Sequence, residues 1–113
     1  MDLDAKAFDL LSAKTLQRIL SAIDDQIDPD VVEAIPSMGV VTLDFQGTRR
    51  NWVVNSQSAA GQIWLAAEQR AWHFSHVGDD PDEAKWVTPK TGEELFATLS
   101  GLLKEHAAVE LSF

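Results

Sequence analysis

The sequence predicts an α+β fold, a two-layer sandwich in which two terminal helices pack on one face of a five- or six-stranded antiparallel sheet. Near both ends of the chain, apolar residues recur every three or four positions. Between these ends they alternate in short segments separated by turn residues. Two helices can cover one face of such a sheet and leave the other face to water. At 113 residues, the chain has the length of a single domain, and we expect that domain to span residues 1–113.

The first helix is predicted over residues 4–27. Asp4 is suited to cap it, because a carboxylate accepts hydrogen bonds from the free N–H groups of a first turn. Pro29 disfavours helical backbone at Asp28, so the helix should end near Ile27. Its apolar side chains line one face: Phe8, Leu11, Leu16, Ile19, Leu20, Ile23 and Ile27.

The middle of the chain reads as a series of short strands. The first should begin at Val32 and Ala34, and residues 36–39 should turn the chain into a strand at 40–45. A loop is expected over residues 56–61. The remaining strands are predicted at residues 50–55, 62–66, 72–75 and 85–87.

A second helix should follow Thr91. With Glu94 three residues later, Thr91 has the spacing of a capping box, in which a hydroxyl and a carboxylate cap the helix start reciprocally. Apolar residues then recur at helical spacing as far as His106, which we expect at the edge of the core. The tail over residues 109–113 alternates and is expected to lie against the helices.

Composition excludes several classes of protein. Eighteen acidic and nine basic residues give a formal net charge of −9, and this field repels nucleic acids and anionic membranes. The absence of cysteine excludes disulfides, thiol nucleophiles and thiolate-held metal clusters. No apolar run approaches the ~20 residues of a membrane span, and the N-terminus is acidic where a targeting segment would be basic. We therefore expect a cytoplasmic protein.

The densest acidic stretch runs from Asp24 to Glu33 and contains no base. We place Asp24, Asp25 and Asp28 in the last turn of the first helix, where the helix dipole makes each carboxylate cost roughly 0.3–1 kcal/mol. Such a cost indicates a use, either holding a hard cation or meeting a basic partner. A solubilising surface is the alternative. Carboxylates without His or Cys suit weak, oxygen-only binding of iron, calcium, magnesium or manganese.

Trp64 is predicted on the open face of the sheet. Its neighbours Ile63 and Leu65 point the opposite way on a strand, so Trp64 faces solvent if they face the helices. An exposed tryptophan is typical of a binding hot spot, whereas partial cover by neighbouring strands is the alternative. Three amides are close enough in sequence to surround it: Asn55, Gln57 and Gln62.

The other tryptophans and the histidines give no sign of catalysis. Large aromatic side chains are usually buried, so we assign these tryptophans to the core: Trp52, Trp72 and Trp86. His73 and His76, three residues apart on a strand, point to opposite faces and do not form a metal site. No phosphate-binding loop or Ser-His-Asp order is present. We expect no catalytic residues, with a weak ferroxidase-type activity as a minor alternative.

Taken together, the order of motifs resembles the frataxin family, and in particular its bacterial (CyaY) branch, from Phe8 to Phe113. Three stretches carry the resemblance: Asn55-x-Gln57-(x)4-Gln62-Ile63-Trp64-Leu65, Trp72–Phe74 and Thr91–Phe96. The resemblance implies a non-enzymatic regulator and iron donor in bacterial iron–sulfur cluster assembly. It also implies a monomer, with iron-induced oligomers left open.

Two surfaces follow from this resemblance. An acidic ridge would bind Fe²⁺ or Fe³⁺ weakly and meet a basic face of an IscS-type cysteine desulfurase. A second surface, the Trp64 patch, would contact the assembly machinery, which includes the iron–sulfur scaffold protein. The acidic ridge comprises Asp24, Asp25, Asp28, Asp30, Glu33 and Asp44. The Trp64 patch comprises Asn55, Gln57, Gln62 and Trp64.

The alternative function is an acidic adaptor module that binds a basic protein without a metal role. Three departures from the family pattern bear on the choice. Residues 18–21 read Arg-Ile-Leu-Ser where relatives often carry a pair of acids, and Ser56 replaces a basic residue. The segment Val77–Lys85 is longer and more acidic than in relatives.

Overall fold

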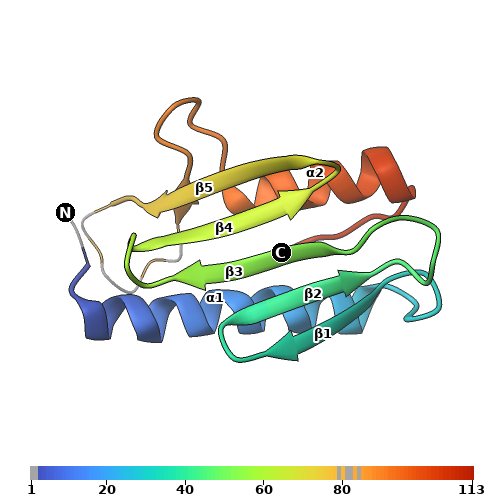
Figure 1. Cartoon of the computed structure of the whole chain (residues 1–113), viewed down its shortest axis with the longest axis horizontal. Helices are drawn as coiled ribbons and strands as arrows, with labels where there is room; N and C mark the ends of the chain where they lie inside the picture. The colour runs from blue at the N-terminus through green and yellow to red at the C-terminus, as the bar shows by residue number, and fades with distance from the viewer. Residues whose placement is uncertain (1–2, 79, 81–82, 84) are drawn as a thin grey trace.

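Two helices pack on one face of a six-stranded antiparallel sheet in a computed structural model that describes residues 3–78, 80, 83 and 85–113 (Figure 1). The elements are α1 (Ala5–Gln26), β1 (Glu33–Ser37), β2 (Val40–Asp44), β3 (Trp52–Gln57), β4 (Gln62–Ala67), β5 (Arg70–His76), β6 (Trp86–Val87) and α2 (Leu95–Ala107). Each strand lies beside its neighbours in sequence, in the order β1-β2-β3-β4-β5-β6. The predicted fold class is confirmed, with six strands.

Helix α1 begins and ends close to its predicted bounds. The Asp4 carboxylate accepts a hydrogen bond from the Ala7 N–H at 2.8 Å, and Ile27 is the C-cap, with its N–H donating to the Ile23 carbonyl at 2.9 Å. The placement of Asp28 in the last turn was wrong, because the helix has already ended at Gln26. Asp28 therefore belongs to the loop between α1 and β1.

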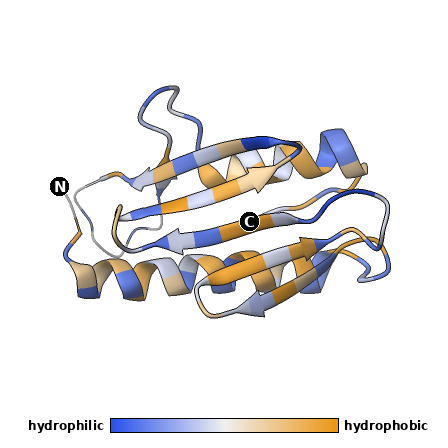
Figure 2. Ribbon diagram, viewed as in Figure 1, coloured by the Kyte–Doolittle hydropathy of each residue, from blue (hydrophilic) through white to orange (hydrophobic). Residues whose placement is uncertain are grey.

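Alternation along the strands separates a buried face from an open face. Figure 2 shows apolar and polar residues alternating along the sheet. In β4, Ile63 and Leu65 are fully buried against the helices, while Trp64 between them is partly exposed. Burial of each such aliphatic side chain contributes about 1.5–3 kcal/mol. The three tryptophans assigned to the core are all buried: Trp52, Trp72 and Trp86.

Strand ends differ from the prediction by one or two residues at several places, and β3 begins at Trp52, two residues later than predicted. The expected loop over 56–61 was wrong at its start, because Ser56 and Gln57 complete β3. Similarly, residues 36 and 37 belong to β1, and only 38 and 39 turn the chain. Strand β5 begins two residues earlier than predicted, after a tight turn at Glu68 and Gln69, whose φ angles are 51° and 63°. Asn and Gly favour such positive φ angles, and this turn contains neither.

Helix α2 begins later than the capping box implied. Glu94 is the N-cap, and its carboxylate accepts the N–H groups of Phe96 (2.9 Å) and Ala97 (3.0 Å). The Thr91 hydroxyl donates instead to the Glu93 carboxylate at 2.9 Å. Gly92 has a φ of 75°, outside the helical region, so the helix cannot start at Thr91. Neither helix of the described chain is long and apolar enough to cross a membrane.

The C-terminal tail lies against both helices, as expected. The Gln26 amide donates to the Ser112 carbonyl (2.6 Å) and accepts the Ser112 N–H (2.8 Å). Leu111 is buried, and the Phe113 ring stacks on Phe96 of α2 with the ring centroids 4.4 Å apart. The tail therefore closes the helical layer between α1 and α2.

Candidate functional site

The acidic ridge occupies one end of the sheet edge formed by β1. Two ridge residues end α1, two lie in the following loop, one begins β1 and one ends β2: Asp24 and Asp25, Asp28 and Asp30, Glu33, and Asp44, in that order. The end of α1, the start of β1 and the end of β2 all meet there (Figure 1). The structure thus brings all six predicted residues to one region.

Charge in this region is not neutralised by any ion pair with Lys or Arg among the residues that the structure describes. The last turn of α1 holds no basic residue, whereas the last turn of α2 holds Lys104 and His106. Glu33 of β1 lies directly opposite Asp44 of β2 in the antiparallel register. Like charges directly opposite one another in a sheet destabilise it, as do carboxylates at a helix C-terminus. The ridge therefore opposes the stability of the fold.

Two ridge carboxylates have a local structural role. Asp28 Oδ1 accepts the Asp30 N–H at 2.9 Å, and Asp44 Oδ1 accepts the Gln46 N–H at 2.8 Å. The Gln46 side chain then donates to the Pro29 carbonyl at 3.0 Å, which joins the β2–β3 connection to the acidic loop. In the described part of the chain, no Lys or Arg forms an ion pair with a ridge carboxylate. These contacts fix the backbone of the ridge and leave its charge unpaired.

The ridge does not form an enclosed metal cage. Among the residues that the structure describes, no three His, Asp or Glu side chains gather closely enough to hold a metal ion. Carboxylates presented at a surface offer oxygen ligands to hard cations, but with few protein ligands per ion. The geometry is compatible with weak cation binding in which water completes the coordination.

The Trp64 patch lies on the open face of β3 and β4. Asn55 pairs with Trp64 across the two strands, and Gln57 pairs with Gln62. The Trp64 indole N–H donates to Gln62 Oε1 at 2.9 Å, which fixes the orientation of the ring. All four side chains are partly exposed. The strands therefore bring together the residues that were predicted to surround Trp64.

His73 is a member of this surface that the sequence reasoning missed. Its ring stacks on Trp64, with the centroids 4.2 Å apart and the planes 15° from parallel. His76 lies on the other face of β5, edge-on to Trp86, so the two histidines do not converge. Had the two-residue turn at Glu68 and Gln69 been recognised, the antiparallel register that it sets would have placed His73 opposite Trp64.

Exposed apolar side chains beside the ridge were also missed. Val31 is 43% exposed and Ile35 is 41% exposed. Met38 is 97% exposed but lies at the tip of the β1–β2 hairpin, at the opposite end of β1 from Glu33 and Asp44. Ile35 lies two residues after Glu33, so strand alternation puts both on the open face. The ridge thus has apolar neighbours that a partner protein could cover.

A polar cluster ties the sheet to α2, at the same end of the strands as the ridge. The Glu68 carboxylate accepts the Trp52 indole N–H and the Arg49 guanidinium, each at 2.9 Å, and lies 3.4 Å from His106 Nδ1. The hydrogen bond from Trp52, then the charges of Arg49 and His106, hold the pKa of Glu68 below its ordinary value. His106 also lies edge-on to Trp52, which confirms its place at the core edge.

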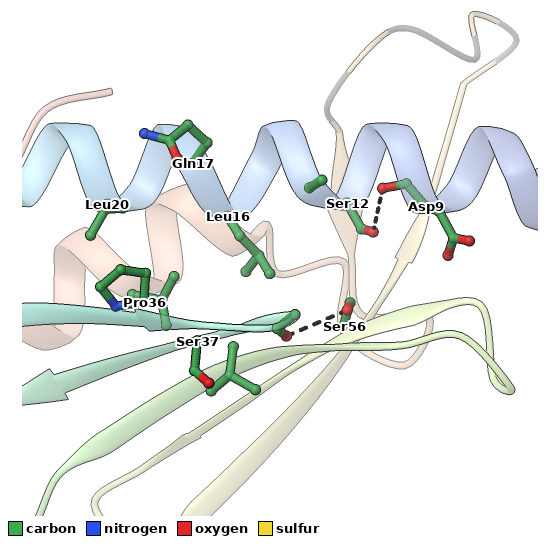
Figure 3. A pocket seen from close by; sticks show the side chains of 12 residues that line it. Asp9, Ser12, Leu16, Gln17, Leu20, Pro36, Ser37 and Ser56 are labelled. Carbon is green, nitrogen blue, oxygen red and sulfur yellow. Dashed lines mark hydrogen bonds between the residues drawn. The ribbon is translucent and has the colours of Figure 1, made fainter.

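A hollow of about 330 Å³ lies between α1 and the β1–β2 hairpin (Figure 3). Leu16 and Leu20 of α1 face Pro36 across it, and two of its hydroxyls are already bonded. Ser12 Oγ donates to the Asp9 carbonyl at 3.3 Å, and Ser56 Oγ to the Gly39 carbonyl at 3.4 Å. Its lining in the described chain includes no ridge residue, so the hollow does not extend the ridge.

The structure shows the contacts of two residues that depart from the family pattern, Arg18 and Ser56. The Arg18 guanidinium lies 4.7 Å from the centroid of the Phe96 ring, so this side chain joins α1 to α2. Ser56 lies against Gly39, as described above. Within Val77–Lys85, residues 79, 81, 82 and 84 lie outside the described residues, so the expectation of a longer, more acidic loop concerns a segment described only in part.

The geometry defines a class of protein: a small α+β domain with an acidic edge and a polar, aromatic open face. Residues 1–109 match the family model of the frataxin-like domain. A protein of Cupriavidus taiwanensis named iron-sulfur cluster assembly protein CyaY is 32% identical over 98% of this chain and 96% of its own length. The protein of the same name from Cupriavidus metallidurans is 34% identical over 97% and 96%.

A solved structure shares the fold. Frataxin from Psychromonas ingrahamii superimposes with a TM-score of 0.83 over 97% of each chain, at 20% sequence identity. The chain belongs to the frataxin family, in its bacterial CyaY branch.

Proposed function

We propose that this protein regulates iron–sulfur cluster assembly, binding iron weakly through the acidic ridge and docking by that ridge on the cysteine desulfurase–scaffold complex. It then acts as an iron donor as well as a regulator. Relatives named as CyaY proteins of iron–sulfur cluster assembly support the process. The observation that carries the proposal is the uncompensated charge of the ridge, which stability does not explain.

The two surfaces would divide the work between them. The acidic ridge attracts a basic partner over several ångströms, and added salt weakens this attraction. The Trp64 patch offers an aromatic ring with its N–H bonded to Gln62, a surface suited to close packing. We assign the ridge to the desulfurase and to Fe²⁺ or Fe³⁺, and the patch to contact with the scaffold protein.

An acidic adaptor without a metal role is the second candidate. It is favoured by the lack of any three-residue metal-ligating group in the described chain. Both candidates predict salt-sensitive docking, so iron dependence distinguishes them.

The test is a titration of this protein against a bacterial cysteine desulfurase, with and without Fe²⁺, at about 0.1 M and about 0.5 M salt. The ridge variant is Asp24→Lys/Asp25→Lys. Its matched control is Glu105→Lys/Glu110→Lys, which replaces two exposed acids on α2 and the tail. Because both doubles replace two acids by two bases, they change the net charge equally.

We expect salt-sensitive binding that the ridge variant loses and the control retains. Binding that survives the ridge variant would contradict docking by the ridge. Binding with no dependence on Fe²⁺, together with no Fe²⁺ uptake by the protein alone, would favour the adaptor.

A further inference from the structure

The outer edge of β5 is paired along only part of its length. Strand β6 pairs with Ser75 and His76, and in the described part of the chain no strand pairs with residues 70–74 on that side. Ala71 and His73 are both exposed. An unpaired strand edge presents N–H and C=O groups that can pair with another chain.

The direction of the backbone groups follows from the hydrogen bonds. The Val77 N–H donates to the Lys85 carbonyl at 2.9 Å, on the β6 side. Because this direction alternates along a strand, the N–H and C=O groups of Ala71 and His73 also point to that side. The close stacking of His73 on Trp64 agrees, since side chains approach most closely in pairs without mutual hydrogen bonds.

A proline ends β6 and leaves this edge open. Ser75 pairs with Val87, so the next hydrogen-bonded pair would join His73 to Pro89. Proline has no N–H to donate, and it is disfavoured inside a sheet for this reason. Thr88 instead donates to the Glu93 carbonyl at 2.9 Å and accepts the Gly92 N–H at 2.8 Å, which turns the chain away from β5.

The open edge borders a groove of about 490 Å³ between β5 and the loop over residues 88–93. Arg70 and Lys90 line this groove, and neither forms an ion pair among the described residues. The Arg70 guanidinium lies 4.5 Å from the centroid of the Trp72 ring, which keeps it beside the edge. Glu93, which also lines the groove, accepts a hydrogen bond from Thr91.

Charge decides which occupant fits. Residues 47–78 carry three bases and one acid in a chain of net charge −9. The acidic ridge lies beside β1, at the opposite edge of the sheet (Figure 1). Pairing β5 with β5 of a second copy would bring two sets of Arg70 and Lys90 together. An extended segment with acidic side chains meets complementary charge instead.

We propose that the β5 edge binds an extended acidic peptide of a partner protein, which pairs with the backbone of Ala71 and His73 and directs its carboxylates toward Arg70 and Lys90. This surface is separate from the acidic ridge, borders the Trp64 patch at Gln62 and His73, and goes beyond the proposed function.

The probe is a capped eight-residue peptide of alternating Asp and Val, titrated into the full-length, ¹⁵N-labelled protein. Binding should shift the amide resonances of Ala71 and His73 and slow their exchange with solvent. The matched peptide is N-methylated at alternate backbone nitrogens, so it keeps the charge and loses its donors. We expect the N-methylated peptide to bind at least about tenfold more weakly, because it loses one or two hydrogen bonds to the β5 edge.

Lys90→Glu should weaken binding of the unmethylated peptide several-fold. Lys14→Glu, at an exposed position of α1, changes the net charge equally and should leave the binding unchanged. Equal binding of the two peptides would overturn the proposal, as would shifts confined to other strands or no shift at millimolar peptide. The β5 edge and its groove contain no ridge residue, so failure here leaves the desulfurase titration and its interpretation unaffected.

Discussion

Thr15 joins two hydrogen bonds inside the core. It accepts the Trp86 indole N–H at 3.0 Å and donates to the Leu11 carbonyl at 2.8 Å, with both side chains buried. Thr15→Val keeps the shape but leaves the indole N–H unpaired, which should destabilise the fold by about 1–3 kcal/mol in urea unfolding. Thr15→Ser is the control, because it keeps the hydroxyl. Equal destabilisation by Val and Ser would show that packing, not the hydrogen bond, matters there.

Glu68 makes stability depend on pH. Since its pKa in the folded protein lies below the ordinary value, its charge stabilises the fold at neutral pH. That contribution is lost as the pH falls below about 4.3, the ordinary range of glutamate, toward the lower folded pKa. Glu68→Gln keeps an acceptor for Trp52 without the charge, so its urea midpoint should fall less steeply on acidification. Curves that run parallel to wild type would contradict this role; Glu110→Gln serves as the exposed control.

At the scale of the element, Asp24 and Asp25 destabilise α1, because they place negative charge at its C-terminal end. Asp24→Lys/Asp25→Lys places cations where the helix dipole favours them, so the variant should be as stable as wild type or more stable by about 0.5–2 kcal/mol. Thermal unfolding measures the change. A marked fall in melting temperature would mean that these carboxylates serve the fold, and would remove the argument that they are kept for binding.

Periodicity was sufficient to predict the elements, and the differences arise at their ends. Both helices and all six strands follow from apolar spacing, because burial on one side imposes that spacing. The turn at Glu68 and Gln69 escaped prediction because it lacks the Asn or Gly that signals positive φ. At α2, the sequence offers both Thr91 and Glu94 as the N-cap. Glu94 is the cap because the positive φ of Gly92 prevents the helix from starting at Thr91.

Across the whole molecule, the two candidate surfaces separate electrostatic attraction from packing. Trp64→Ala should leave the unfolding free energy within about 1 kcal/mol, because the ring is partly exposed on the open face. The same variant should lower the effect on desulfurase activity in the presence of scaffold protein, at both salt concentrations. Trp52→Ala, in the core, is the contrast and should cost about 3–5 kcal/mol. A comparable loss of stability in Trp64→Ala would show that Trp64 is a core residue.

Composition and alternation predicted where most residues of the candidate site lie, and Asp44 was added by the resemblance to the frataxin family. The ridge was visible as a run of acids, and the open face of Trp64 followed from its buried neighbours Ile63 and Leu65. What joins distant strands was not visible: the stacking of His73 on Trp64 and the pairing of Glu33 with Asp44 depend on register, which turns set.

The two hydrogen bonds between the Gln26 side chain and the Ser112 backbone have a consequence for folding during synthesis. Among the described residues, strand pairings join only strands adjacent in sequence. The Gln26–Ser112 pair joins residues 86 positions apart, and the Trp86–Thr15 bond joins residues 71 apart. Hairpins can form as the chain leaves the ribosome, but the helical layer closes only when the segment around Ser112 has also emerged. Until then the sheet exposes part of its apolar face, and exposed apolar surface makes an incompletely folded chain prone to aggregation.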